Sequence, residues 1–170
     1  MRKIVFLFFI VFQLQSCIKP GMYSVVDNTL FSEPYKDPQF YLIYSGKKEQ
    51  KIANKFAEEL RVAFESSSMY PFINVIDSNE MNESQIKTMV EKAVNDKSAD
   101  VIFTFKLTHV TLNESYGMTS IIDFNYLITA FDYKIHKEVW KSNVYSPWYS
   151  DSVNKTAVML VQKLKSDKVL

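Results

Sequence analysis

The sequence predicts an α/β (α+β) domain built on a mixed β-sheet, with the element order β-α-β-α-β-β-β-α and one long antiparallel hairpin. Short apolar strands at 40–44, 72–76 and 101–110 alternate with segments of helical periodicity in the first half of the chain. In the second half, residues 121–133 alternate between apolar and polar and are followed by a returning run at 138–145. The first pattern is typical of parallel strands joined by crossover helices, and the second of antiparallel strands.

Each predicted helix has apolar residues spaced three and four positions apart. The first covers 47–67, and its apolar face consists of Ile52, Phe56, Leu60, Ala63 and Phe64. The second begins at Asn82, three residues before Gln85 as in a capping box, and its stripe is Ile86, Met89, Val90, Ala93 and Val94. The third is capped by Ser150 or Ser152 and carries Val153, Ala157, Leu160, Val161 and Leu164. Because crossover connections are right-handed, we expect the helices to pack on one face of the sheet.

Two connections in the second half of the chain are predicted from their turn residues. Lys134–Lys137 contains no glycine, so a loop of about four residues is expected there instead of a two-residue turn. Residues 111–120, which include Asn113 and Gly117, are predicted to form the most exposed loop of the domain.

The first seventeen residues have the pattern of an export signal. Arg2 and Lys3 precede an unbroken apolar run from Ile4 to Phe12. As a helix this run would reach about 14 Å, roughly half the apolar core of a bilayer, so it predicts a secretion segment and not a transmembrane span. The closing Leu14-Gln15-Ser16-Cys17 resembles the lipobox of bacterial lipoproteins, in which the thiol receives a diacylglycerol and cleavage frees the cysteine amine for acylation by a fatty acid such as palmitate. The alternative, a plain signal peptide, would leave one unpaired thiol in an exported protein.

These observations divide the chain into a signal peptide at 1–16, a tether at 17–38 that starts at the lipidated Cys17, and a folded domain at 39–170. The tether region is broken by Pro20, Gly21, Pro34 and Pro38, and it also carries apolar residues. Two interpretations therefore remain open for it: a free spacer, or an arm packed along the domain with a short extended piece at 23–26.

Charge and cysteine content exclude several classes of protein. The chain has 20 Lys and Arg residues against 19 Asp and Glu. Loss of Arg2 and Lys3 with the signal leaves 18 against 19, and Arg61 is then the remaining arginine. A nucleic-acid-binding surface normally shows a basic excess and several arginines, so no nucleic-acid partner is expected. A single cysteine excludes a core built on disulfides within the chain.

The sequence contains no arrangement that predicts catalysis. Its two histidines, His109 and His136, have no second histidine or cysteine at metal-ligand spacing, so both are expected at the surface or at a strand edge. Three glycines in the whole chain leave no nucleophile elbow and no glycine-rich phosphate loop. Adjacent carboxylates such as Glu58 and Glu59 usually form a solvated helix face, and Asp132 near a turn usually accepts hydrogen bonds from backbone. We therefore expect no enzyme activity, no metal and no cofactor.

Aromatic residues near the end of the chain are the candidate contact residues. The candidates for contact with a partner lie in predicted loops or near them, where Trp and Tyr are enriched at interfaces: Tyr116, Met118, Tyr145, Trp148 and Tyr149. Packing into the core is the open alternative for Tyr145, Trp148 and Tyr149.

Several segments between residues 40 and 170 resemble small envelope lipoproteins whose domain is similar to the amino-terminal domain of TolB. The resemblance includes the strand Phe40–Gly46 before a long helix, Ala99-Asp100-Val101-Ile102 at a strand start, and a closing helix that ends at Leu164–Leu170. Its main motif is a hairpin with an aspartate, a lysine and a tryptophan, here Asp132, Lys137 and Trp140, although His136 stands where the family has glycine. The resemblance implies that Trp140 packs in the core, beneath a helix.

The resemblance implies a function in binding. Better understood relatives include outer-membrane activators of penicillin-binding proteins and assembly lipoproteins, which act by binding proteins. We therefore expect a non-enzymatic lipoprotein whose periplasm-facing domain binds another envelope protein or a cell-wall component. Ile18 after the cysteine resembles outer-membrane sorting signals, since it is not aspartate. The alternative is an exported domain that binds or hydrolyses a small molecule in a pocket between the sheet and the loops.

Overall fold

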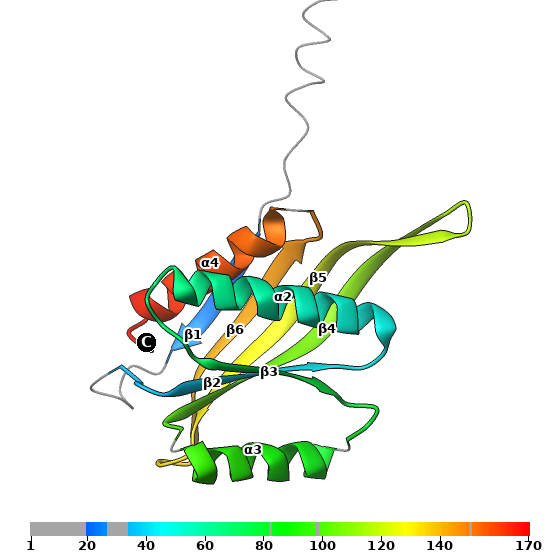
Figure 1. Ribbon diagram of the computed structural model, residues 1–170. Helices are drawn as coiled ribbons and strands as arrows, with labels where there is room; N and C mark the ends of the chain where they lie inside the picture. The colour runs from blue at the N-terminus through cyan, green and yellow to red at the C-terminus, as the bar shows by residue number, and fades with distance from the viewer. Residues whose placement is uncertain (1–19, 27–33, 82, 98, 150) are drawn as a thin grey trace, which may run out of the picture.

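The computed structural model describes residues 20–26, 34–81, 83–97, 99–149 and 151–170. The described elements, in chain order, are β1 (Gly21–Val26), β2 (Pro38–Tyr44), α2 (Lys47–Glu65), β3 (Phe72–Asp77), α3 (Glu83–Lys97), β4 (Val101–Ser115), β5 (Met118–Asp132), β6 (Lys137–Pro147) and α4 (Ser152–Ser166). Figure 1 shows them arranged as a twisted sheet with helices on both of its faces.

The six described strands form one mixed sheet in the order β1-β6-β5-β4-β2-β3. β2 pairs in parallel with β3 and with β4, whereas β4, β5, β6 and β1 pair antiparallel with their neighbours. The predicted mixed sheet and the predicted order from β2 to α4 are therefore confirmed. An additional strand, β1, precedes them.

The helices lie on two faces of the sheet, and the expectation of a single covered face was wrong. α2 and α4 pack on one face, here called the α2 face, whereas Val90 of α3 packs with Tyr41 and Ile102 on the other, here called the α3 face. The strand order explains the difference. The chain moves from β2 outward to β3, and then returns past β2 to β4. Two crossovers of the same hand that move in opposite directions must pass over opposite faces.

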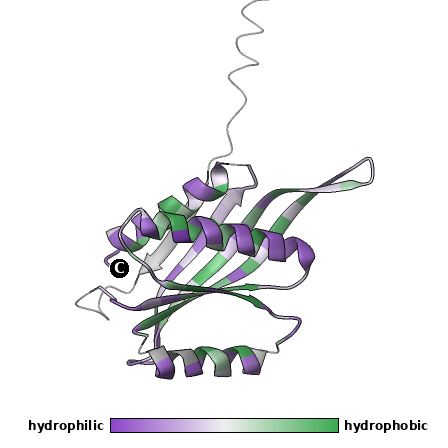
Figure 2. Cartoon of the chain, in the orientation of Figure 1, coloured by the Kyte–Doolittle hydropathy of each residue, from purple (hydrophilic) through white to green (hydrophobic). Residues whose placement is uncertain are grey.

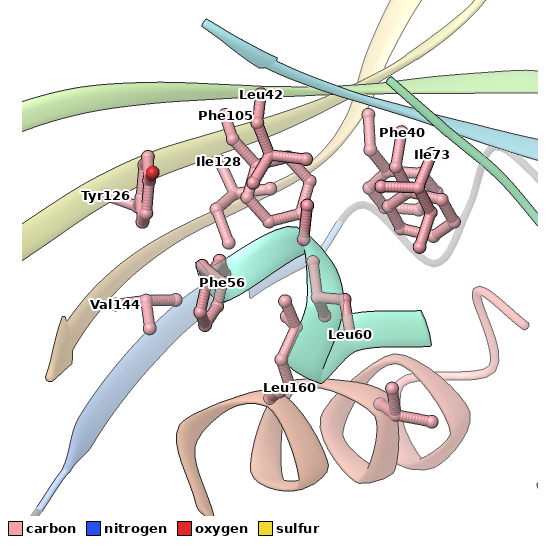
Figure 3. Packing of buried hydrophobic residues seen from close by; sticks show 14 of the residues in the cluster. Phe40, Leu42, Phe56, Leu60, Ile73, Phe105, Tyr126, Ile128, Val144 and Leu160 are labelled. Carbon is pink, nitrogen blue, oxygen red and sulfur yellow. The ribbon is translucent and has the colours of Figure 1, made fainter. Parts of the chain in front are cut away.

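The main core lies on the α2 face and is rich in aromatic rings. Phe56 of α2 stacks on Tyr126 of β5 with ring centroids 5.3 Å apart, and Phe40 stacks on Phe103 at 4.6 Å. Figure 3 shows Phe56 and Leu60 of α2 and Leu160 of α4 pointing toward these strand residues. The visible surface of α2, in contrast, is mostly hydrophilic in Figure 2. Such one-sided apolar character is what the spacing of residues in α2 predicts.

Trp140 belongs to this core. Its side chain is 1% exposed, and its indole N–H donates to Oδ2 of Asp167 at 2.8 Å. Because Asp167 directly follows α4, this hydrogen bond ties β6 to the C-terminal end of that helix.

Residues 111–120 are not a loop, which corrects the sequence-based expectation. β4 and β5 continue as a hairpin through two register irregularities and close where Ser115 pairs with Met118. The two turn residues, Tyr116 and Gly117, both have positive φ (51° and 74°), as a type I′ turn requires. The pattern was missed because residues 113–120 are exposed on both faces, so the period-two signal of a half-buried strand is lost.

The connection between β5 and β6 has four residues, 133–136, as expected. Asp132 holds this turn, because its Oδ1 accepts hydrogen bonds from the backbone N–H of Lys134 at 2.7 Å and of Ile135 at 3.2 Å. His136 has φ = 52°, a left-handed conformation that explains why the resembled hairpin has glycine at this position.

Where the structure describes the segment before β2, this segment packs along the domain as an arm and is not a free spacer. β1 pairs with β6 over all six of its residues. Further along, the backbone N–H of Tyr35 donates to the Val169 carbonyl at 3.0 Å. The hydroxyl of Tyr35 donates to Oδ2 of Asp132 at 2.8 Å. Cys17 and residues 27–33 lie outside the described residues.

Helix starts differ from the expected caps. Asp151 is the N-cap of α4 and makes no side-chain capping hydrogen bond, so Ser152 does not have the expected role. Ser152 is the first helical residue, and Ser150 lies outside the described residues. Asn82, the expected cap of α3, also lies outside them.

A buried hydroxyl in the core gives a first prediction. Tyr126 is fully buried and its hydroxyl has no hydrogen-bond partner in the described part of the chain; burial raises its pKa. Because an unsatisfied buried polar group costs about 1–3 kcal/mol, we expect Tyr126→Phe to raise the free energy of unfolding by about 1 kcal/mol in urea titrations. Tyr41→Phe is the control, since the Tyr41 hydroxyl donates to Gln39 at 2.8 Å and its removal should destabilise. A loss of stability in Tyr126→Phe would contradict the prediction.

A second prediction concerns the contact between α2 and α4. Glu59, 12% exposed, binds Lys55 at 2.6 Å and accepts a hydrogen bond from Asn154 of α4 at 2.7 Å. The hydrogen bond from Lys55, and next that from Asn154, lower the pKa of Glu59. A lowered pKa stabilises the fold above the unfolded-state value, and this stabilisation is lost as pH falls through the folded-state value.

We therefore expect Glu59→Gln to cost about 1 kcal/mol at neutral pH and to approach the stability of the unmodified protein under acid conditions. Glu58→Gln is the matched control, because Glu58 is 68% exposed and should change stability by less than about 0.5 kcal/mol. Thermal unfolding over a range of pH measures both. A difference for Glu59→Gln that does not depend on pH would contradict the ionic contribution.

Candidate functional site

The predicted contact residues do not form one patch. Trp148 is half-buried at the end of β6, with its ring centroid 6.0 Å from that of Phe124 in an edge-on contact. Its backbone N–H donates to the Ile122 carbonyl at 2.7 Å. Tyr149 follows it and is 60% exposed. The Trp148 ring is therefore fixed against the core, whereas the Tyr149 side chain next to it is exposed.

Tyr145 points toward the other face of the sheet. Its neighbours Val144 and Ser146 are buried toward the α2 face, so the alternation of a strand directs Tyr145 to the α3 face. Its hydroxyl donates to Asp123 at 3.4 Å, and burial, followed by the charge of Asp123, raises the pKa of Tyr145.

Tyr116 and Met118 lie at the tip of the β4–β5 hairpin and are 99% and 74% exposed. β6 ends opposite Asp123, five residues after Met118, so the hairpin extends about 16 Å beyond the last β6 pair. Figure 1 shows this tip projecting from the body of the domain.

Three lysines lie beside Trp148. Lys47, Lys48 and Lys51 occupy the first turns of α2, are exposed, and form no ion pair with the described residues. The ammonium of Lys51 lies 6.0 Å from the centroid of the Trp148 ring. A hollow of about 300 Å³ is lined by all three lysines, Trp148 and four residues of the projecting β4–β5 hairpin, namely Leu112, Thr119, Ser120 and Ile121.

We call this region the Trp148 surface: Lys47, Lys48, Lys51, Trp148 and Tyr149, with the hairpin tip Tyr116 and Met118 beyond it. A second hollow, of about 420 Å³, extends it along α2 and is lined by Lys51, Asn54, Lys55, Glu58, Trp148, Tyr149 and Val153. Sequence reasoning missed the lysines. A detectable signal was present, because the first turn of a helix favours acidic residues and this one begins Lys47-Lys48.

A larger hollow than these two lies on the α3 face, where a groove of about 960 Å³ runs between α3 and the sheet. Its apolar lining is Ile43, Met81, Ile86, Val90, Leu107, Phe131 and Tyr133. Thr104 and Thr129 lie in it on paired strands, with hydroxyl oxygens 3.1 Å apart. Charges of both signs also line the groove: Glu49, Lys87, Glu91 and Lys106.

The groove exists because α3 covers only part of its face. α3 packs over β2, β3 and the start of β4, whereas Leu127, Thr129 and Phe131 of β5 are only half-buried. This groove was not predicted from the sequence, because all the helices were expected on one face of the sheet.

The histidines and carboxylates show no catalytic grouping among the described residues. His109 is exposed and its Nε2 lies 3.2 Å from Oγ1 of Thr111; His136 is exposed beside the groove. Asp132 and Glu59 are occupied by the turn and by the α2–α4 contact. Within the described ranges, no three His, Cys, Asp or Glu residues are placed to hold a metal ion. None of the described helices is both long and apolar enough to cross a membrane.

Comparison with known proteins shows the fold. No family model and no curated protein sequence matches the chain. A solved structure of a dodecamer of a PelC variant from Paraburkholderia phytofirmans matches with a TM-score of 0.51 and 7% identity, over 87% of this chain and 97% of that one. The lipoprotein GNA1162 from Neisseria meningitidis matches with a TM-score of 0.40 and 14% identity, over 76% of this chain and 96% of that one. The chain thus shares its fold with PelC, and the resemblance to TolB stays a prediction.

The different packing of Trp148 and Tyr149 can be measured. We expect Trp148→Ala to cost about 2 kcal/mol, because the half-buried ring loses its contact with Phe124. Tyr149→Ala should change stability by less than about 0.5 kcal/mol, because its side chain is mostly exposed. Urea unfolding of the two variants measures the difference. Equal costs would show that Trp148 is not anchored as described.

Proposed function

We propose that this chain is a non-enzymatic lipoprotein of the bacterial cell envelope, anchored through Cys17, that binds a protein partner through the groove on the α3 face. The lipobox-like Leu14–Cys17 supports the anchor. The absence of aspartate at position 18 supports the outer membrane, with the domain facing the periplasm. Anchoring confines the domain to a surface and raises its effective concentration near a partner there.

The composition of the groove carries the second part of this proposal. Its floor is apolar, with Ile86, Phe131 and Tyr133, and its charged side chains are of both signs. An apolar centre with a polar rim is the usual composition of protein interfaces. A site for a small anionic ligand would instead be lined by positively charged side chains. The hydroxyls of Thr104 and Thr129 and the mixed charges suit the alternating polar groups and side chains of a polypeptide.

The small-molecule alternative is less well supported by the same groove. Ligand pockets generally bury most of the surface of a bound small molecule. This groove is only partly enclosed. Two of its charged side chains, Lys87 and Glu91, face each other in an ion pair at 3.9 Å on one side of α3. We therefore infer a binding role, with the partner on the α3 face.

Crosslinking in living cells tests the partner site. A photoreactive amino acid is placed at Lys87 and, separately, at Thr129, both of which line the groove; Lys165, exposed near the end of α4, is the control position. We expect one discrete adduct of the same mass from both groove positions and none from Lys165. Phe131→Lys should abolish this adduct, because it places a charge in the apolar floor. Adducts of equal yield from all three positions would contradict the proposal.

The anchor is tested separately. Mass spectrometry of the mature N-terminus should find acylated Cys17. Cys17→Ser should leave the N-terminus without acyl chains. An unmodified thiol in the native protein would contradict the anchor, and would leave the result of the crosslinking experiment unaffected.

A further inference from the structure

The chain enters the sheet beside the Trp148 surface. Gly21, the first residue of β1, pairs with Tyr145, which lies three residues before Trp148. Only four residue steps separate Gly21 from Cys17, and four extended residues span at most about 14 Å. An acyl group on Cys17 would therefore be held close to this end of the sheet. In Figure 1, β1 begins at the end of the sheet where β6 finishes and α4 starts.

The chemistry of the Trp148 surface suits a phospholipid headgroup layer. Lys47, Lys48 and Lys51 present three ammonium groups without ion-pair partners among the described residues. Lysines attract anionic headgroups, and Trp and Tyr are the side chains enriched at membrane interfaces. Trp148 and Tyr149 supply these rings next to the lysines.

Several acidic side chains also lie near this surface, but none of those that the structure describes forms an ion pair with the three lysines. Glu49, in the same first turn of α2, accepts a hydrogen bond from the backbone N–H of Ser45 at 2.7 Å. Glu58 lies 3.6 Å from the ammonium of Lys55. Glu114 lies one residue below the hairpin closure, and Asp151 is the N-cap of α4. Asp123 accepts the Tyr145 hydroxyl on the other face of the sheet. The three exposed lysines of α2 therefore present their charge without forming an ion pair to a described carboxylate.

The hairpin tip departs from local preference. The first position of a type I′ turn strongly favours Asn, Asp or Gly, yet here it holds Tyr116 with φ = 51° and 99% exposure. Met118 beside it is 74% exposed. A tyrosine in a left-handed conformation that is almost fully exposed to solvent is unfavourable for the folded state, and such positions are expected where function requires the side chain.

From these four observations we propose that the Trp148 surface lies on the anionic headgroup layer of the membrane that holds Cys17. Lys47, Lys48 and Lys51 contact lipid phosphates, and Tyr116 and Met118 enter the interface. The inference rests on the proposed lipid anchor. It assigns two roles to two surfaces, because the membrane occupies the Trp148 surface and the α3 face keeps its groove for the protein partner.

The tryptophans of the chain provide the probe. The sequence has two, of which Trp140 is buried and Trp148 is at this surface. The full acylated protein, purified from cells, is reconstituted into vesicles of phosphatidylethanolamine and phosphatidylglycerol that carry bromine near the headgroup end of the acyl chains. We expect quenching of Trp148 fluorescence, isolated by subtracting the signal of Trp148→Phe. Vesicles of phosphatidylcholine alone should give weaker quenching.

Matched variants identify the groups responsible. Lys47→Gln/Lys48→Gln/Lys51→Gln should lower the ratio of docked to undocked protein by about fivefold for each lysine, since each is worth about 1 kcal/mol near an anionic surface. Lys92→Gln/Lys165→Gln/Lys168→Gln makes the same charge change elsewhere on exposed positions and should leave quenching unchanged. Tyr116→Asn introduces a residue that the turn favours, so the variant should fold normally. It should reduce the quenching of Trp148, because it removes the aromatic ring from the hairpin tip.

The outcomes separate the docking from the anchor. Acylated protein whose Trp148 is not quenched overturns the docking and leaves the anchor intact. If the purified protein carries no acyl chain, the proposed anchor is overturned. Quenching of Trp148 in that protein by added vesicles would still support the docking. Absence of quenching would then overturn the docking as well as the anchor. If both lysine triple variants lose the same amount of Trp148 quenching, the Trp148 surface is not the one that contacts the membrane. A discrete protein adduct from a photoreactive residue at Tyr149 in cells, without quenching, would make this surface a protein interface instead.

Discussion

The burial of β2 on both of its faces is the constraint on which the rest of the structure depends. Phe40 and Leu42 are fully buried beneath α2, and Tyr41, between them, is 1% exposed on the α3 face. Burial of each large apolar side chain contributes about 1.5–3 kcal/mol. A strand with apolar residues on both sides requires cover on both sides, which only helices on opposite faces provide. The parallel pairing of β2 with β3 and β4 brings those helices there: the crossover from β2 to β3 carries α2, and the crossover from β3 back past β2 to β4 runs in the opposite direction and carries α3 over the other face.

The antiparallel half of the sheet follows a different rule. β4, β5 and β6 are buried on the α2 face by the rings of Phe105, Phe124 and Tyr126, while their α3 face is partly open. Antiparallel sheets tolerate one solvated face, so nothing in the fold requires α3 to extend over β5. The open groove results from this partial cover. The same arrangement therefore accounts for the core on one face and for the accessible apolar surface on the other.

The ends of the strands are also unequal. At one end, Asp132 organises the β5–β6 turn and accepts a hydrogen bond from Tyr35. At the other end, β6 finishes at Pro147, the β4–β5 hairpin projects beyond it, and β1 begins. The second end places exposed aromatic residues, the lysines of α2 and the entry of the chain together. Residues distant in sequence, such as Lys47 and Trp148, become neighbours there because α2 runs over the antiparallel strands and reaches the end of β6.

Three features were predictable from the sequence: the order of the elements from β2 to α4, the one-sided apolar face of α2, and the four-residue turn that follows Asp132. These features depend on periodicity and on contacts within a short stretch of chain. The tertiary structure alone decided which face each helix covers, how far the β4–β5 hairpin extends, and which residues line the groove. Alternation along a strand states which side chains share a face, but not which helix covers them. That choice depends on strand order, which is a long-range property. The extended hairpin was equally hidden, because backbone pairing between exposed strands leaves little trace in the pattern of apolar residues.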